Sequence, residues 1–473
     1  MTRHANAGGG GTSRGRFGRR DRAVIAAAGI CMLLVQMDFF ALNLMLPVIG
    51  RDFHTPATNL QWLFSGSMLA LGALLITGGR AADLWGRKRV LVTGLTGYAL
   101  ASVGCAVAPN PAWLIAGRVV QGCTTALVFP VAVAVVTAYF QDARQGRAVA
   151  IVITCGTIGT IVGPVVGGAL AEHVSWRALF LLNLPFCLTA IVLLLRHVPE
   201  TRDEQAGGRP APPSVLTLAG GVAGILIGVD QGRRWGWDSA ATLGCLAAGV
   251  ALLGVFLRID QRSERPLLDL GLLRNRLFVA VALAGTLSNM VHALVNLFSA
   301  IYLQQVRGLS PLGSGLVFLA LSVGLGVGNY SSGHLAERIR PETLIVGGLL
   351  LSGVSLFTLT WMTDLAAYTA VFAVVGLGGG AVWALANVTT QSYVEPGRLA
   401  AASGLFLTTI VLFGAVTLAV GSTLLEAISG SEVHAAFDGP AIDTLLRGAA
   451  LLSVLGSAAL MLVTRGRRRP AGG

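Results

Sequence analysis

Two ionisable side chains lie inside long apolar segments of the sequence. Asp38 is near the middle of the apolar segment 23–49, and Arg118 lies about two turns inside the apolar segment 111–140. A charged side chain at the centre of a bilayer costs at least about 2.5–3.5 kcal/mol on insertion scales, so such a residue indicates a functional or structural role. A carboxyl group withdrawn from water holds a proton more readily. The sequence therefore predicts that Asp38 takes up and releases protons, and that it attracts lipophilic cations when ionised.

Arg118 is expected to be the partner of this acid. It is the only basic residue inside a predicted span, and no acid other than Asp38 is evident at the middle of one. We expect the two side chains to pair when Asp38 is ionised and to separate when it is protonated, so that both take part in proton coupling. The alternatives are a static buried pair and an acid that is only hydrogen-bonded inside the bundle.

A second set of polar residues shares one face of the predicted helix 278–304. They follow one another at alternating steps of four and three residues: Gly285, Asn289, His292, Asn296 and Ser299. Amide and imidazole groups are costly against lipid, so this face meets protein or a water-filled cavity. We predict that it faces Asp38 across a substrate cavity lined by Asp38, Asn43, Asn289, His292 and Asn296. His292 is a candidate proton acceptor, or alternatively a side chain that only hydrogen-bonds to neighbouring helices.

The elements that position these residues follow from composition. Of 473 residues, 54% are hydrophobic and only 12% are charged, whereas soluble domains carry about 25% charged residues. An ordinary soluble enzyme is therefore excluded. Segments long enough to cross a bilayer occur fourteen times: at about 23–49, 58–79, 90–109, 111–140, 146–171, 176–196, 214–230, 239–258, 278–304, 311–332, 342–362, 366–391, 398–425 and 441–464.

The distribution of basic residues predicts the orientation of these spans. The net charge of +12 comes from short basic runs between apolar segments, which is typical of membrane proteins and does not indicate a nucleic-acid partner. With the N-terminus inside, the outside loops hold only Arg51, Arg177, Arg233, Arg234, Arg307 and Arg447. The positive-inside rule therefore places both termini in the cytoplasm.

A weak internal repeat predicts how the spans are grouped. Gly79–Leu84 follows the second span and Gly333–Arg338 follows the tenth, and both are Gly-x-x-Ala-acid stretches. Each stretch then follows the second span of a six-span unit, and two six-helix halves around a midplane site are a transporter design. The predicted domains are a flexible basic tail 1–22, a six-helix bundle 23–196, a linker with two extra spans 197–277, a second six-helix bundle 278–464 and a basic tail 465–473.

The loop after the second span carries the most specific motif. Its residues are spaced as Gly-x-x-x-Asp-x-x-Gly followed by cations: Gly79, Asp83, Gly86, Arg87 and Lys88. Glycines permit close helix approach, and an acid at a helix end can pair with cations or with a neighbouring helix N-terminus. We predict a loop that latches one state of a moving helix pair. The alternative is a tight turn that only carries positive charge.

These residues resemble the signature loop G-x-L-A-D-R-x-G-R-K of the major facilitator superfamily, although Ala81 and Leu84 depart from it. Three further stretches are similar to the fourteen-span drug:proton antiporter subfamily: residues 38–47, 114–122 and 159–168. The last resembles the antiporter motif G-x-x-x-G-P-x-x-G-G through Gly159, Gly163, Pro164, Gly167 and Gly168. Trp176, Arg177, Asn183 and Pro185 also resemble this subfamily.

The resemblance implies an all-α integral membrane protein with the major facilitator fold, built of two six-helix bundles and two extra spans. It also implies proton coupling through Arg118 and an antiport function. We therefore expect a proton-driven exporter of small amphiphilic or cationic drugs in the cytoplasmic membrane, acting as a monomer on small molecules within the lipid bilayer. A dedicated exporter of a natural product, lipid or peptide is the alternative, and a membrane sensor is a remote one. No nucleotide-binding or metal motif occurs, so we expect no catalytic residue, metal or cofactor.

Overall fold

The computed structural model describes residues 17–55, 59–140, 144–202, 212–262, 270–394, 399–429 and 439–464. Within these ranges the chain is almost entirely helical, which confirms the all-α prediction. The predicted tail 465–473 and residues 1–16 of the predicted tail 1–22 lie outside the described residues. The first helix begins at Arg19, a turn earlier than the sequence predicts.

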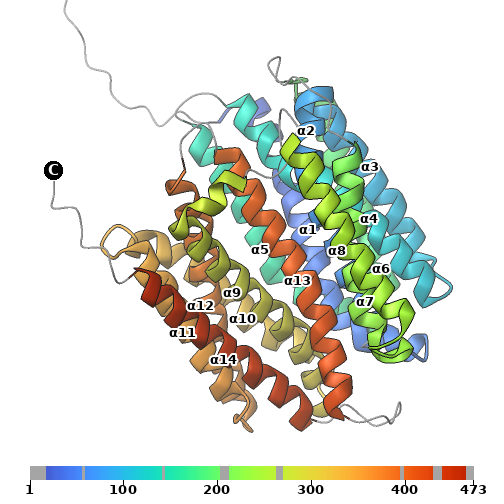
Figure 1. The fold of residues 1–473 in the computed structure, drawn as a ribbon. Helices are drawn as coiled ribbons and strands as arrows, with labels where there is room; N and C mark the ends of the chain where they lie inside the picture. The colour runs from blue at the N-terminus through green and yellow to red at the C-terminus, as the bar shows by residue number, and fades with distance from the viewer. Residues whose placement is uncertain are drawn as a thin grey trace, which may run out of the picture.

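Fourteen α-helices are found among the described residues (Figure 1). Their bounds are α1 (Arg19–Asp52), α2 (Trp62–Trp85), α3 (Arg87–Ala106), α4 (Pro111–Tyr139), α5 (Gln145–His173), α6 (Arg177–His197), α7 (Pro212–Trp235), α8 (Ala240–Arg262), α9 (Arg276–Ile301), α10 (Pro311–Leu335), α11 (Pro341–Leu359), α12 (Leu365–Ser392), α13 (Leu399–Ser429) and α14 (Gly439–Thr464). A short π-helix, Tyr302–Val306, continues α9.

Most of these helices are long and apolar enough to cross a membrane. In the part of the chain that the structure describes, twelve satisfy this on their own, and α2 makes a thirteenth if its two parts, which meet at a 47° bend, form one span. The apolar part of α7 is shorter, at Leu216–Val229. The protein is thus a multi-pass membrane protein, while the fourteenth span stays a prediction.

Local sequence explains where several helices begin. Asn110, Ser310 and Asp364 accept hydrogen bonds from backbone N–H groups at the start of α4, α10 and α12, and such caps satisfy donors that have no partner inside the helix. These three helices start at the same end of the molecule, which we call the distal end. The opposite end, where α1 and α9 begin and Gly86 joins α2 to α3, is called the basic end.

The helices form two groups whose cores merge at one end only. At the basic end, α1–α6 share one buried cluster that includes Leu91 and Val135, and the later helices share another that includes Val281 and Val382. At the distal end a single cluster joins both groups, with α1–α4 and α6 on one side and α9–α14 on the other. The two bundles are therefore packed together distally and have separate cores at the basic end. The predicted domain limits fall before α7 and in the first turn of α9, and the division itself stays a prediction.

Two helix pairs face each other across the boundary between the bundles: α5 with α10 and α2 with α13. The extra helices α7 and α8 pack against each other, and α7 contacts both α2 and α13 (Figure 1). Their shared apolar cluster contains Leu218 and Leu226 of α7, Phe256 of α8, and Ala415 and Ala419 of α13. The inserted pair thus covers the α2–α13 side of the boundary.

Candidate functional site

Asp38 and Arg118 form a buried ion pair inside the first bundle. Arg118 Nη1 lies 2.6 Å from Asp38 Oδ2, and each residue is 2% exposed. Arg118 Nε also donates to the backbone carbonyl of Leu63, at 3.2 Å. The pair joins α1 to α4, while the Leu63 bond adds α2. The structure thus places the two predicted coupling residues in direct contact.

Every oxygen of the Asp38 carboxylate has a donor. Asn183 Nδ2 of α6 donates to Oδ1 at 2.8 Å, and the buried Tyr98 of α3 lies close to Asp38. Gln121 Oε1 accepts from Arg118 at 2.8 Å, and its amide nitrogen donates to Ser102 at 2.7 Å. A buried pair with such additional hydrogen bonds offsets its desolvation penalty, whereas loss of one partner leaves an uncompensated charge.

This network adds residues that sequence reasoning did not assign to the site: Tyr98, Ser102 and Gln121. Gln121 lies three residues after Arg118 and so shares its helix face, which was an available signal. Tyr98 and Ser102 carry no such signal, because single hydroxyl groups are common in apolar helices. Chemically, the arrangement can hold one proton on Asp38, at the expense of the bond to Arg118.

The polar stripe of α9 faces its own bundle. Asn289 Nδ2 donates to the carbonyl of Ile410 in α13 at 3.2 Å, and Gly285 lies against Ala386 of α12 and Phe406 of α13. Asn296 donates to the carbonyl of His292 at 2.8 Å. None of the hydrogen bonds found among the described residues joins this stripe to Asp38, and Asn43 is buried on α1. The shared cavity stays a prediction.

His292 packs into a notch in α12 that Gly379 provides. Its Nδ1 lies 2.9 Å from the carbonyl of Ser288, and a methyl group at Gly379 would overlap the imidazole ring. The imidazole ring therefore packs on α12, while its hydrogen bond to Ser288 stays within α9, and the cavity role of His292 stays a prediction.

The notch makes a testable prediction. Gly379→Ala is expected to lower the free energy of unfolding by about 1–3 kcal/mol, the usual effect of overpacking a core. The same change in a His292→Ala background should cost less, because the ring is gone. Thermal unfolding of the two single variants and the double variant measures the coupling. Additive effects would contradict this packing.

The loop between α2 and α3 is held within the first bundle. Asp83 Oδ1 accepts from Arg87 Nη2 at 2.8 Å, which supplies the partner that the sequence left open. Gly86 has φ of +105°, a conformation that L side chains rarely adopt. Glu200, which follows α6, accepts from the backbone of Lys88 at 3.1 Å. Sequence reasoning missed Glu200, whose position just beyond a helix end was the only signal.

The glycine motif of α5 presents two different faces. A methyl group added at Gly159 or Gly163 would lie 2.5 Å from Leu33 O or 2.8 Å from Met37 O of α1, and Gly167 packs on Ala41 in the same way. These three glycines therefore permit close packing inside the first bundle.

The other face of the motif closes the boundary between the bundles. A methyl group added at Gly168 would lie 2.8 Å from Leu312 Cα of α10, and one added at Gly315 would lie 2.6 Å from the carbonyl oxygen of Pro164. We call this contact of Pro164 and Gly168 with Pro311, Leu312 and Gly315 the distal seal. Gly79 of the earlier loop, in contrast, has open space around it.

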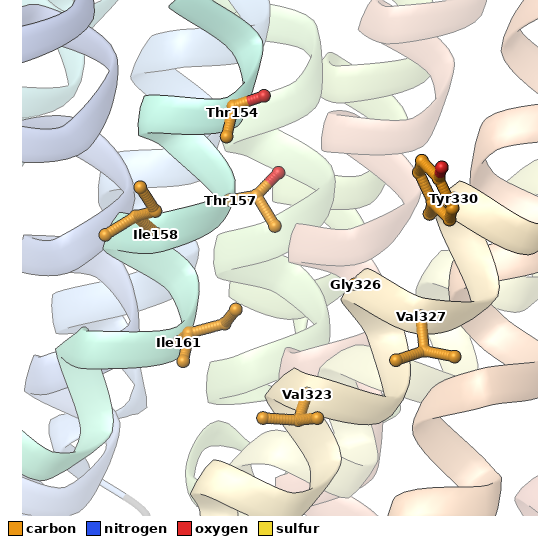
Figure 2. Close-up of a pocket in the computed structure, with 8 residues that line it drawn as sticks. All are labelled: Thr154, Thr157, Ile158, Ile161, Val323, Gly326, Val327 and Tyr330. Atoms are coloured by element: carbon orange, nitrogen blue, oxygen red, sulfur yellow. The ribbon is translucent and has the colours of Figure 1, made fainter. Parts of the chain in front are cut away.

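Toward the basic end the same two helices separate. A hollow of about 360 Å³ lies between α5 and α10. Figure 2 shows the residues that line it: Thr154, Thr157, Ile158, Ile161, Val323, Gly326, Val327 and Tyr330. Tyr330 is 74% exposed. The packing of α5 on α10 is therefore tight at the distal end and looser toward the basic end, where the hollow lies.

Comparison with known proteins places these features in a wider context. The sequence profile of the Major Facilitator Superfamily matches residues 28–418. The multidrug efflux pump LfrA of Mycolicibacterium smegmatis is 34% identical over 413 residues, which cover 86% of this chain and 82% of LfrA. The tetracenomycin C resistance and export protein of Streptomyces glaucescens is 30% identical over 427 residues, covering 87% of this chain and 77% of that protein.

Among solved structures, the nucleoside transporter NupG is similar in fold. The two chains superpose with a TM-score of 0.68 at 13% sequence identity, covering 94% of this chain and all of NupG. At that identity the likeness concerns the fold alone.

Proposed function

The chain belongs to the major facilitator superfamily, and on that premise we propose that it exports small amphiphilic or cationic drugs in exchange for protons. The observation that carries the proposal is the buried pair of Asp38 and Arg118, 2.6 Å apart inside a membrane bundle. Such a pair binds a proton and an organic cation in competition, because both neutralise the same carboxylate. The named relatives LfrA and the tetracenomycin C exporter support the direction of transport.

The packing of α1 on α5 supports a connection between this pair and the distal seal. Asp38 lies on α1 between Met37 and Ala41, whose backbones pack on Gly163 and Gly167 of α5. The next face of α5 carries Gly168, which contacts α10 of the second bundle. A shift of α1 when Asp38 is protonated thus reaches the distal seal through one helix pair. Alternating access moves bundles around a fixed site in this way.

The direction of opening follows if the basic end faces the cytoplasm, as the arginine distribution predicts. In this proposal the distal seal then closes the outside, and substrate enters the protein from the cytoplasmic side. The surface of the hollow is almost entirely apolar, and the hydroxyls of Thr154 and Thr157 donate to carbonyls of their own helix, so the hollow suits the apolar part of an amphiphilic molecule. In this proposal the proton gradient drives a monomer in the cytoplasmic membrane, without a cofactor, metal or catalytic residue.

A second candidate function is the dedicated export of one natural product. The similarity to the tetracenomycin C resistance and export protein favours it. The two candidates differ in breadth of substrate and share the coupling chemistry.

Proton release from everted membrane vesicles tests the proposal. A pH-sensitive dye reports the vesicle interior, and lipophilic monovalent cations and neutral antibiotics are added in turn. We expect at least one class to release protons from acidified vesicles, since each substrate that enters must displace a proton. Vesicles without the protein are the control. Release by several unrelated compounds supports drug export, and release by one compound supports the dedicated exporter. Uptake of substrate with no proton movement would contradict proton coupling.

A further inference from the structure

Glu172, near the end of α5, forms a hydrogen bond with α10 of the second bundle. Its Oε2 accepts a hydrogen bond from the backbone N–H of Leu312 at 3.0 Å, and its carboxylate lies close to Ser310. Ser310 is the cap residue of α10 and accepts from Gly313 N at 3.0 Å. An acid of the first bundle thus caps a helix of the second.

This contact extends the distal seal by one turn. Pro164, Gly168 and Glu172 follow one another at steps of four residues, so they lie along one face of α5. Pro164 and Gly168 pack against α10 without room for a methyl group at Gly168, and Glu172 meets the first turn of α10. Thr157 and Ile161 continue this face toward the basic end, where they line the hollow. The polar contact therefore lies where the bundles touch and not where they separate.

The physical consequence depends on what changes when the bundles move. The first N–H groups of a helix have no acceptor within the helix, and the helix dipole favours a negative charge beside them. The Glu172 carboxylate meets these groups only while the distal ends of α5 and α10 are together. A contact shifts an equilibrium between two states only if it differs between them. Because the Glu172 contact is made only when the distal ends are together, it favours the state that is closed at the distal end.

We propose that Glu172 is a positioning residue that holds the distal seal closed and so sets the ratio of the two transport states. The inference rests on the alternating-access function proposed above and adds a residue outside the proton site. The other charged group acting on this carboxylate is its neighbour His173. Because the carboxylate is exposed to solvent, we expect a modest effect: loss of the contact raises the population open at the distal end by about two- to fivefold.

Double electron–electron resonance on the full-length protein in lipid nanodiscs measures this ratio. In a background in which the native cysteines are replaced, one spin-label pair at Thr154 and Tyr330 reports the basic end. A second pair at the exposed Val174 and Val306 reports the distal end. For Glu172→Ala we expect the distal label pair to show a larger population at a longer distance. The basic-end pair should show a larger population at a shorter distance, by the same factor. A variant that merely loosens the fold lengthens both distances.

Asp364→Ala is the matched control. Asp364 also accepts from a backbone N–H at the start of a helix, that of Ala367 at 2.8 Å, but it caps α12 within its own bundle. The Asp364→Ala variant should therefore leave the ratio of the two transport states unchanged. Glu172→Gln keeps a hydrogen-bond acceptor and loses the charge, so it should shift the population ratio by an intermediate amount. If the alanine variant folds poorly, the glutamine variant tests the proposal in its place.

Unchanged populations in both Glu172 variants, or an equal shift in Asp364→Ala, would overturn the proposal. The measurement uses neither substrate nor a proton gradient. Failure of the vesicle assay with a clear population shift would therefore refute proton-coupled export and leave the role of Glu172 standing, and the reverse result would refute only the role of Glu172.

Discussion

Asp38→Asn is expected to abolish substrate-dependent proton release in everted vesicles. Asparagine keeps the size of the side chain and can still accept from Asn183, but it cannot hold the exchanged proton. It also leaves the buried Arg118 guanidinium without its counter-charge. Breaking one partner of a buried pair typically costs about 3–5 kcal/mol, so the variant should also unfold at a lower temperature. The dye assay and a thermal melt measure the two effects.

A double variant, Asp38→Asn with Arg118→Gln, separates coupling from stability. It removes both charges and leaves neutral groups that can hydrogen-bond to Gln121 and Asn183. Thermal stability should return toward that of the wild-type protein, because no uncompensated charge remains. Proton release should stay absent. Recovery of both stability and proton-coupled transport would show that the pair is static and would remove Asp38 from the coupling mechanism.

Gly168→Ala is expected to shift the protein toward the state open at the distal end. A methyl group there would lie 2.8 Å from Leu312 Cα and still closer to Pro311 O, so α5 and α10 must separate. Overpacking of this kind costs about 1–3 kcal/mol. Because the contact exists only in the distally closed state, that energy changes the population ratio by about 5–150-fold. The spin-label pairs at the two ends measure the shift.

The adjacent glycine is the natural control. Gly167→Ala adds the same methyl group one residue earlier, but against Ala41 of α1 within the first bundle. That contact is present in both states if the bundle moves as a unit, so the variant should lose stability without a population shift. The two variants together thus distinguish packing inside a bundle from packing between bundles. A population shift of equal size in both would mean that the glycine motif acts as a single flexible hinge.

Several features of the fold and the site were predictable from sequence. The fourteen apolar segments match the fourteen described helices, because hydropathy and length determine which segments become helices in a bilayer. The contact of Asp38 with Arg118 was predictable for a similar reason: two opposite charges withdrawn from water must satisfy each other. The family was also evident from sequence, since its glycine motif lies along one helix and its loop motif joins two helices that are consecutive in the chain.

Only the tertiary structure decided which neighbour each helix face meets. Periodicity places Gly159, Gly163 and Gly167 on one face of α5, but it cannot distinguish the α1 side from the α10 side that Gly168 occupies. In the same way it identified the polar stripe of α9 without showing that His292 packs on α12. Helix period is a local property, whereas the identity of a packing partner depends on contacts between residues far apart in the chain.

The same distinction explains the residues that sequence analysis missed. Glu172 and Glu200 are ordinary surface acids by composition, and each acquires a role only because the N-terminus of another helix lies beside it. The tight contact of Gly168 with Leu312 and the hollow farther along the same two helices likewise depend on how α5 and α10 pack. Hydropathy determined that these helices exist and that Asp38 must be paired. The side chains that meet across the bundle boundary determined which end is closed, because two packings of the same helices differ only in those long-range contacts.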